Sequence, residues 1–285
     1  MLKVLLCIPP AYDCNFPPLG TPALSAFLKS KGIPALQKDL NIAYRDFLAG
    51  KIKTSSPVKE KKALLAFTVN QFFAGKLKNR YYSAFLPGRS DKIFPYLPYD
   101  NNTNSSYHFA ERMLSSRHLR RYLEDEKENT FLQFYRESKF LDFLAKEKIN
   151  LLGISIIAPS QALASLTLGR LVKKHLPHVH VVIGGQWPTL YRNELAKRKD
   201  FFSFYGSIIV FEGETPLYNL ALALNSGQDI SALPNVITKE NRSRFRFNHM
   251  GENMNSLPCP DFDGLPLRDP TRPNIGVYES WPKIF

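Results

Sequence analysis

Cysteine is scarce in this 285-residue chain, and long apolar runs are absent from it. The three cysteines (Cys7, Cys14 and Cys259) are too few for a disulfide framework or a four-cysteine metal site within one chain. The longest apolar runs, such as Val4–Ile8 and Ala63–Phe67, are far shorter than the ~18–20 residues of a membrane-spanning helix. Two prolines directly follow Val4–Ile8, so this run predicts a strand and not a signal peptide. We therefore expect a cytoplasmic protein that does not cross a membrane.

Several signature motifs are also missing. The sequence contains neither GxGxxG nor GxxxxGK[ST], so it lacks the usual sequence fingerprints of dinucleotide and nucleoside triphosphate sites. It has no HExxH zinc motif and no GxSxG nucleophile elbow. Three of the six histidines cluster at His175, His178 and His180, where a helix is predicted to end and a strand to begin. We expect surface roles for them and no metal site.

What the chain does contain is typical of a globular protein with one or two domains. Hydrophobic residues make up 44% of the chain and charged residues 22%, which is enough apolar material for a sizeable core. The net charge of +13 is concentrated between residues 41 and 92, where eleven lysines and arginines face three acidic residues. The centre of this basic segment consists of Lys51, Lys53, Lys59, Lys61, Lys62, Lys76, Lys78 and Arg80.

Three interpretations of the basic segment at residues 51–80 differ in what it contacts. A solvated helical surface is favoured, because charged helix faces are usually exposed to water. A patch that docks an acidic partner or an anionic substrate is the next interpretation. Nucleic acid is the least favoured partner, since no zinc-finger spacing or RNA-recognition aromatic motif accompanies the charges.

The order of predicted elements indicates an α/β fold with a doubly wound parallel sheet. A buried strand at Leu2–Ile8 is followed by a proline-rich loop and by a helix with Thr21 as N-cap, Pro22 at its first position and Gly32 after its last turn. Residues 33–40 predict a second strand. The alternation then stops until residue 148, and we expect residues 41–148 to be a helical insertion whose aromatic residues form mainly their own core, with ligand contacts as the alternative.

The alternation of strands and helices resumes at Leu151. Further strands are expected at residues 151–157, 179–183 and 207–211, with helices at 160–175, 188–199 and 215–224 between and after them. Residues 236–247 predict a hairpin with polar residues 240–243 at its turn, and the proline-rich tail from Leu257 to Phe285 predicts an extended linker. The predicted domains are therefore residues 1–240, interrupted by the insertion, and residues 241–285.

Ligands of open parallel sheets bind beyond the carboxyl ends of the strands, so the loops at these ends are the candidate site. Each loop contributes small or polar residues, and their convergence on one edge predicts a binding site. The candidates are Tyr12 and Asn15 after the first strand; Ser155, Ile156, Ile157 and Ser160 after the third; Gly184, Gly185 and Gln186 after the fourth; and Glu212, Gly213 and Glu214 after the fifth.

Each candidate also has a purely structural explanation. The Gly184-Gly185 pair alone is explained by a tight turn. Ser155 is explained as a buried core hydroxyl, and Ser160 as a helix cap. Glu212 and Glu214 complement the positive N-terminal end of the following helix.

The order of short motifs resembles the N-terminal half of cobalamin-binding radical SAM enzymes. The resemblance covers about residues 1–40 and 148–270 and rests on PPLGTPAL at 17–24, GISII at 153–157, VIGG at 182–185, EGET at 212–215 and LPCPDFD at 257–263. It implies a cobalamin-binding portion of an enzyme for radical methyl transfer or rearrangement, without the substrate being identified.

In that family a Ser-x-Leu sequence and a Gly-Gly pair surround the nucleotide tail of cobalamin. By this resemblance Ser155 bonds the benzimidazole nitrogen, and Gly184-Gly185 lets the backbone approach the tail. The first loop lacks Asp-x-His-x-x-Gly, so the resemblance implies base-off cobalamin without a histidine ligand, Tyr12 or Asn15 being the candidate weak oxygen donors below cobalt.

The resemblance also implies a radical SAM barrel that would carry a [4Fe-4S] cluster and S-adenosylmethionine. Its CxxxCxxC motif is absent, and Cys7, Cys14 and Cys259 do not supply that spacing. We expect this chain to be a fragment that would be followed by the barrel. The alternatives are a non-enzymatic cobalamin carrier or sensor and a docking scaffold that has lost cobalamin.

Overall fold

The computed structural model describes residues 2–10, 12, 18–55, 121–126, 129–247, 251–269 and 272–276. These residues belong to two units. The first comprises Met1–Pro9, Pro18–Leu40 and Ser138–Leu265, and the second comprises Pro10–Pro17, Asn41–Glu137 and Pro266–Phe285. The first unit thus includes residues 138–148, which the sequence assigns to the insertion, and residues 241–265, which it assigns to the second predicted domain. Most of the basic segment at residues 51–80 lies outside the described residues, which include only its first part, residues 51–55 of α2 (Leu40–Ser55).

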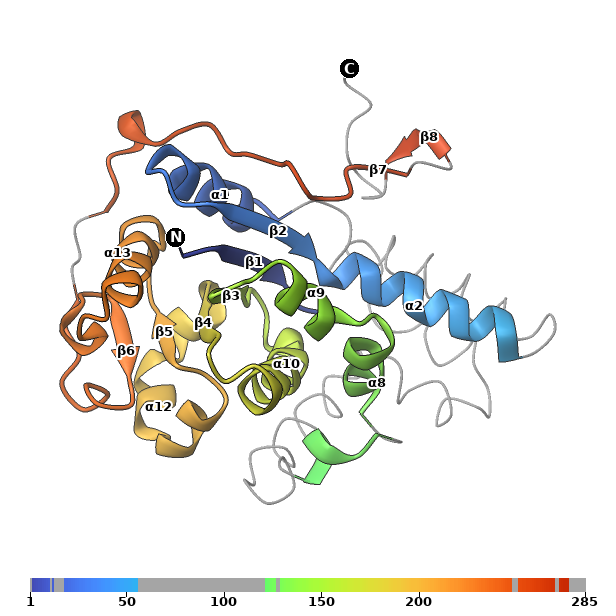
Figure 1. Ribbon diagram of the computed structural model, residues 1–285, viewed down its shortest axis with the longest axis horizontal. Helices are drawn as coiled ribbons and strands as arrows, with labels where there is room; N and C mark the ends of the chain where they lie inside the picture. Colours follow the sequence, from blue (N-terminus) through green and yellow to red (C-terminus); the bar gives the residue numbers. More distant parts are fainter. Residues whose placement is uncertain are drawn as a thin grey trace, which may run out of the picture. The chain divides into compact units, whose positions relative to one another are not determined.

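The first unit is built on a six-stranded sheet (Figure 1), in which five strands correspond to the predicted parallel strands and β6 is added at one edge. The strand order is β2-β1-β3-β4-β5-β6, in which all pairs are parallel except β5 with β6. The strands are β1 (Val4–Ile8), β2 (Ala35–Asp39), β3 (Leu151–Ser155), β4 (His180–Gly184), β5 (Ser207–Ile209) and β6 (Val236–Thr238). The predicted α/β fold class is confirmed.

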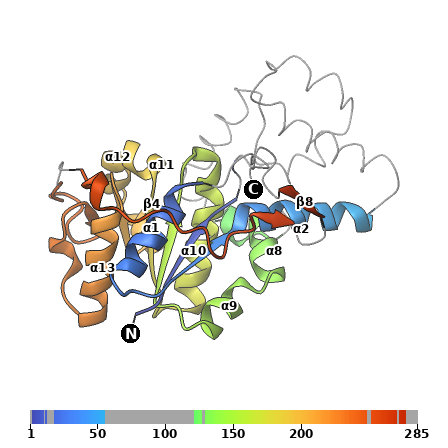
Figure 2. The same cartoon turned by 90° about the horizontal axis from the view of Figure 1, so that it is seen from above.

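Helices cover both faces of this sheet (Figure 2). Side chains alternate between the faces along each strand, so Val4 and Leu6 of β1 face α1 (Gly20–Ser30) and α13 (Glu214–Ser226) in one core cluster. The other helices of this unit are α9 (Phe140–Lys146), α10 (Ala162–His175), α11 (Gln186–Leu190) and α12 (Arg192–Lys197). β1 is buried at every position, as expected for a parallel strand with helices on both sides.

Three local predictions are wrong. α1 begins at Gly20, so Thr21 lies within the first turn and makes no cap hydrogen bond. Ser160 lies in the 3-10 turn Pro159–Gln161 before α10 and is not its N-cap. The predicted hairpin at 236–247 has no second strand: β6 pairs with β5, and the turns after β6 bring back only the Arg246 carbonyl, which accepts from Asn235 N–H at 2.9 Å. By contrast, Gly32 follows the last turn of α1 with a positive φ of 77°, as the sequence predicts, and Gly227 ends α13 in the same way at 68°.

The second unit contains α2 (Leu40–Ser55), α8 (Thr130–Glu137) and a short hairpin of β7 (Arg268–Asp269) and β8 (Arg272–Gly276). This hairpin lies where the sequence predicts an extended linker. The buried Tyr44 ring packs against Phe131 and Phe134 at centroid distances of 5.1 and 5.3 Å. Its hydroxyl lies 2.7 Å from Thr130 Oγ1. These described aromatic residues therefore form an internal core, as predicted.

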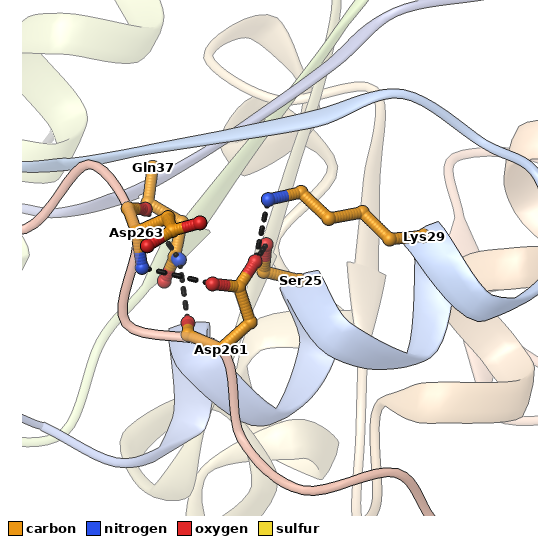
Figure 3. Close-up of polar contacts among 5 residues, drawn as sticks. All are labelled: Ser25, Lys29, Gln37, Asp261 and Asp263. Carbon is orange, nitrogen blue, oxygen red and sulfur yellow. Dashed lines mark hydrogen bonds and ion pairs between the residues drawn. The ribbon is translucent and has the colours of Figure 1, made fainter.

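Residues 257–265, which we call the clasp, run back along α1 and β2 (Figure 3). Asp261 is the centre of its contacts: its carboxylate accepts hydrogen bonds from Ser25 Oγ at 3.2 Å and from Lys29 Nζ, and its backbone N–H donates to the Pro22 carbonyl at 3.1 Å. Gln37 Nε2 donates to two carbonyls of the clasp, those of Asp261 at 2.8 Å and Asp263 at 3.0 Å. The clasp is thus held by side chains of both α1 and β2.

Replacing Asp261 by asparagine is expected to lower the free energy of unfolding by about 1 kcal/mol at pH 7, since Lys29 is partly exposed to solvent. Burial alone would raise the pKa of Asp261, but the hydrogen bonds and charge of Lys29, with bonds from Asp263 N–H and Ser25, hold it below its ordinary value. The stabilisation is therefore present above pH ~3.9 and is lost as the pH falls through the lowered pKa. Urea titrations at several pH values test this, with exposed Asp142→Asn as control; a difference between Asp261→Asn and the original chain that persists unchanged at pH 2 would contradict it.

Candidate functional site

The carboxyl ends of β1, β3, β4 and β5 meet at one edge of the sheet, because these strands are parallel. Sequential strands lie on opposite sides of the β1–β3 pair, since β2 follows β1 on one side and β4 follows β3 on the other. This is the switch in strand order at which open α/β sheets bind ligands. The loops after β1 and β3 are therefore the first place to look for a site.

Gln161 joins these two loops. Its side chain is fully buried, and Nε2 donates to the Pro9 carbonyl at 2.8 Å. Its Oε1 accepts from the backbone N–H groups of Ile157 at 2.8 Å and Ala158 at 3.1 Å. One amide thus fixes the end of β1 to the loop after β3, and the Ile157 backbone is committed to this internal contact.

Ser155 lies at the end of β3, next to the first turn of α1. A Cβ atom added to Gly20 would stand 3.8 Å from Ser155 Oγ, so the helix backbone and the hydroxyl are in ordinary contact distance. In the same turn the Thr21 side chain is 1% exposed, and its Oγ1 has no hydrogen-bond partner among the described residues. A half-buried hydroxyl, a buried unpaired hydroxyl and a helix N-terminus therefore come together at the switch point.

Gly185 is required by the fold itself. Its φ angle is +103°, and an added Cβ would lie 2.5 Å from the Ile156 carbonyl oxygen. Ile156 N–H donates to the Gly184 carbonyl at 2.8 Å, and Trp187 N–H donates to the Ile156 carbonyl at 3.2 Å. The loops after β3 and β4 thus pack backbone against backbone. The geometry favours the tight-turn explanation for Gly185, whereas Gly184 has only ordinary contacts.

The loop after β4 is tied to the loop after β5 by Thr189. Its Oγ1 donates to the Gly185 carbonyl at 2.9 Å and accepts from Phe211 N–H at 2.9 Å. Phe211 has a positive φ of 66°, and the Arg192 guanidinium lies 5.1 Å from its ring. Gln186, a predicted site residue, is exposed at the start of α11.

The acidic side chains of the loop after β5 are largely occupied by contacts with other residues of this chain. Glu212 accepts a hydrogen bond from Glu252 N–H, and the Glu252 carboxylate accepts from Thr215 N–H at 3.0 Å in the first turn of α13. Gly213 lies against α1, since an added Cβ would be 3.1 Å from a methyl group of Leu24. Burial raises the pKa of Glu214, and the charges of Glu252 and Glu212 raise it further. These residues hold residues 251–252 against α13.

The two predicted donors below cobalt, Tyr12 and Asn15, do not belong to the described part of the first unit. Tyr12 belongs to the second unit, where its backbone N–H and carbonyl pair with the Asn41 side chain, both at 2.9 Å. Asn15 lies outside the described residues. Ser160 is half-buried in the 3-10 turn beside Gln161.

Sequence reasoning missed Gln161, Gly20 and Thr21 as members of this edge. Gln161 directly follows Ser160, and Gly20 and Thr21 belong to the PPLGTPAL motif. The sequence contained a signal for these residues, because Gln161 and the Gly20-Thr21 pair both border loops that lie at the switch point. Which loop amide would reach across to Pro9 depends on the strand order, and the strand order is not readable from one sequence.

The predicted surface role of His180 is wrong. Its Nε2 lies 2.8 Å from Ser207 Oγ, and Gly206 is so close that an added Cβ would lie 2.4 Å from the imidazole ring. Burial lowers the pKa of His180 to about 4, and the charge of Lys173 lowers it further. No group of three or more histidine, cysteine, aspartate or glutamate residues in the described part of the chain could hold a metal ion.

Comparisons with known proteins leave the family open. No family model matches the chain, and no curated protein sequence matches it. Two structures of the radical S-adenosylmethionine methyltransferase TsrM from Kitasatospora setae are similar in fold at 13% sequence identity. One has tryptophan substrate and a SAM analogue bound (TM-score 0.39; 87% of this chain, 30% of that chain), and the other has cobalamin and a [4Fe-4S] cluster bound (0.40; 94% and 33%). The chain spans about a third of the length of these structures.

Proposed function

We propose that this chain is the cobalamin-binding portion of a radical SAM enzyme. The observation that carries the proposal is the position of Ser155 at the β1–β3 switch point beside Gly20, the first residue of α1. The sequence resemblance independently assigns the same serine to the nucleotide tail of cobalamin. When bound, cobalamin supplies a cobalt ion that accepts and passes on a methyl group.

The residues at this edge fit the polar part of the cofactor. Ser155 offers a hydroxyl to the benzimidazole nitrogen, and the unpaired Thr21 hydroxyl and the N-terminus of α1 suit the phosphate of the tail. Gly185 supports the site indirectly, because it lets the β4 loop pack on Ile156. We propose that the cofactor is bound base-off, since a tail held at Ser155 removes its own base from cobalt.

The expected result is that the purified chain binds hydroxocobalamin with an affinity of about 1 µM or better. Ser155→Val should weaken binding at least about tenfold, because it removes a hydrogen bond to a polar atom of the tail. The matched control is Ser30→Val at the opposite end of α1, where Ser30 Oγ donates to the Phe27 carbonyl. Visible absorbance after desalting measures uptake, and thermal melts show that the variants are folded.

Paramagnetic resonance of the same samples identifies the axial ligand of cobalt after an added one-electron reductant has converted cobalt(III) to cobalt(II). Base-off binding without protein imidazole predicts axial lines without nitrogen triplets. Triplet splitting would overturn the assignment of base-off cobalt without protein imidazole, whereas an absence of pigment uptake by the original chain would overturn cobalamin binding itself. Equal losses in Ser155→Val and Ser30→Val would remove Ser155 from the site.

The other parts of the implied enzyme are proposals about a longer protein. We propose that the [4Fe-4S] cluster and S-adenosylmethionine belong to a barrel that follows this chain, and that the basic segment at residues 51–80 faces an acidic partner or solvent.

No helix in the described residues is long and apolar enough to cross a membrane. The carrier or sensor alternative uses the same proposed cobalamin site, and an open reading frame with CxxxCxxC after Phe285 would distinguish the enzyme from it.

A further inference from the structure

A basic pocket lies at the edge of the sheet opposite to the proposed cobalamin site. Residues 197–203 lead from α12 into the start of β5, and Lys239 directly follows β6. Because β6 is antiparallel to β5 with Thr238 opposite Ser207, the end of β6 lies beside the amino end of β5 (Figure 1). The pocket has a volume of about 560 Å³. Its lining consists of Lys197, Arg198, Lys199, Asp200, Phe202, Ser203 and Lys239.

The lining carries four cationic side chains and one carboxylate. Its internal ion pairing is weak: Arg198 Nε lies 3.8 Å from Asp200 Oδ1, and Lys197 pairs outside the pocket with Glu194, both side chains being about two-thirds exposed. Lys199 and Lys239 are exposed and form no ion pair with any residue that the structure describes. An excess of positive charge therefore remains in the pocket.

The wall behind the pocket holds two further cations, Lys173 and Arg242. Lys173 of α10 is half-buried, and its Nζ donates to the carbonyls of Phe202 at 3.3 Å and Tyr205 at 3.4 Å. Burial lowers the pKa of Lys173, and the positive charge of Lys239 lowers it further. Arg242 donates from Nη1 to the Ala196 carbonyl at 3.3 Å, which fixes the end of α12. Cations are thus gathered here although they repel one another.

We propose that this pocket binds a small soluble ligand that carries two or more linked phosphoryl groups. Cations converging from α12, the 3-10 turn at residues 199–203 and the turn after β6 match a polyanion better than a single charge. The volume lies within the ~300–1,000 Å³ range of small-molecule sites. Phe202, the aromatic residue of the lining, is only 5% exposed, so it offers no ring for base stacking, and single-stranded nucleic acid is disfavoured.

The test is a calorimetric titration of the whole chain with inorganic pyrophosphate at constant ionic strength. The original chain should bind pyrophosphate more tightly than inorganic phosphate. Lys199→Glu combined with Lys239→Glu should weaken binding at least about tenfold, because two attractive charges become repulsive. The control combines Lys31→Glu with Lys146→Glu, which makes the same change of net charge at other exposed positions and should alter affinity by less than about twofold.

If the variant with Lys199→Glu and Lys239→Glu melts at a lower temperature than the original chain, the combination of Lys199→Gln and Lys239→Gln gives a second measurement. This neutral variant should bind pyrophosphate with intermediate affinity. An equal loss in the control variant, no heat of binding with the original chain, or tighter binding of single-stranded RNA than of pyrophosphate would each overturn the proposal. Hydroxocobalamin uptake should be the same in all these variants. A failure here is therefore separate from a failure of the cobalamin site.

Discussion

Replacing Gly185 by valine is expected to lower the free energy of unfolding by about 4 kcal/mol. Two costs combine at this position. The backbone at φ +103° and ψ −172° is open only to glycine, and a Cβ atom would lie 2.5 Å from the Ile156 carbonyl oxygen. That carbonyl accepts the Trp187 N–H, so moving it away would also break a hydrogen bond. Urea titration monitored by circular dichroism measures the loss.

Gly184→Ala is the matched control for Gly185→Val. An added Cβ at Gly184 meets its nearest atom, the Ile209 carbonyl oxygen, at an ordinary 3.6 Å, so the loss should be below about 1 kcal/mol. Cobalamin uptake by Gly185→Val should fall only in proportion to the unfolded fraction. A stable Gly185→Val protein that has selectively lost cobalamin would contradict this, and would show that the glycine serves the cofactor and not the turn.

The sequence was sufficient for the positions of most strands and helices of the first unit because apolar periodicity and helix punctuation are local. Buried runs such as Val4–Ile8 and glycines such as Gly227 mark strands and helix ends without knowledge of the strand order. The predicted hairpin at residues 236–247 was wrong for a non-local reason. β6 finds its partner in β5, about 30 residues earlier, and the Asn241 side chain closes the turn on Val236 and Thr238.

The candidate site was predictable as an edge but not as a set of contacts. Parallel strands bring the loops after β1, β3 and β4 together, which the alternation of elements already indicates. Tertiary structure decides which residues of these loops face one another. Thus Glu212 and Glu252 meet across 40 residues of chain, and Ser155 meets Gly20 of α1, neither of which spacing along the sequence indicates. His180 likewise begins β4 in a segment that the sequence assigns to the surface, although Ser207 and Gly206 pack against its ring.

Gln161→Leu should lower the free energy of unfolding by about 3 kcal/mol, the second-largest effect expected. Leucine keeps nearly the same shape but leaves the Pro9 carbonyl and the N–H groups of Ile157 and Ala158 without their partner. The control Gln186→Leu changes an exposed glutamine of the neighbouring loop and should cost less than about 0.5 kcal/mol. A small loss in Gln161→Leu would mean that water replaces the amide at these groups.

Gln161→Glu separates the two halves of this contact. A carboxylate still accepts from Ile157 and Ala158 N–H, but it repels the Pro9 carbonyl and is charged in a fully buried position. Burial should raise the folded pKa of the introduced glutamate above its unfolded value of ~4.3, so the loss should be smallest below that pH and grow as the pH rises to the folded pKa. Unfolding measured between pH 4 and 8 tests this sign. A stability difference from the original chain that does not change with pH would show that the introduced carboxylate reaches solvent, and that the loops after β1 and β3 are not held together by a buried amide.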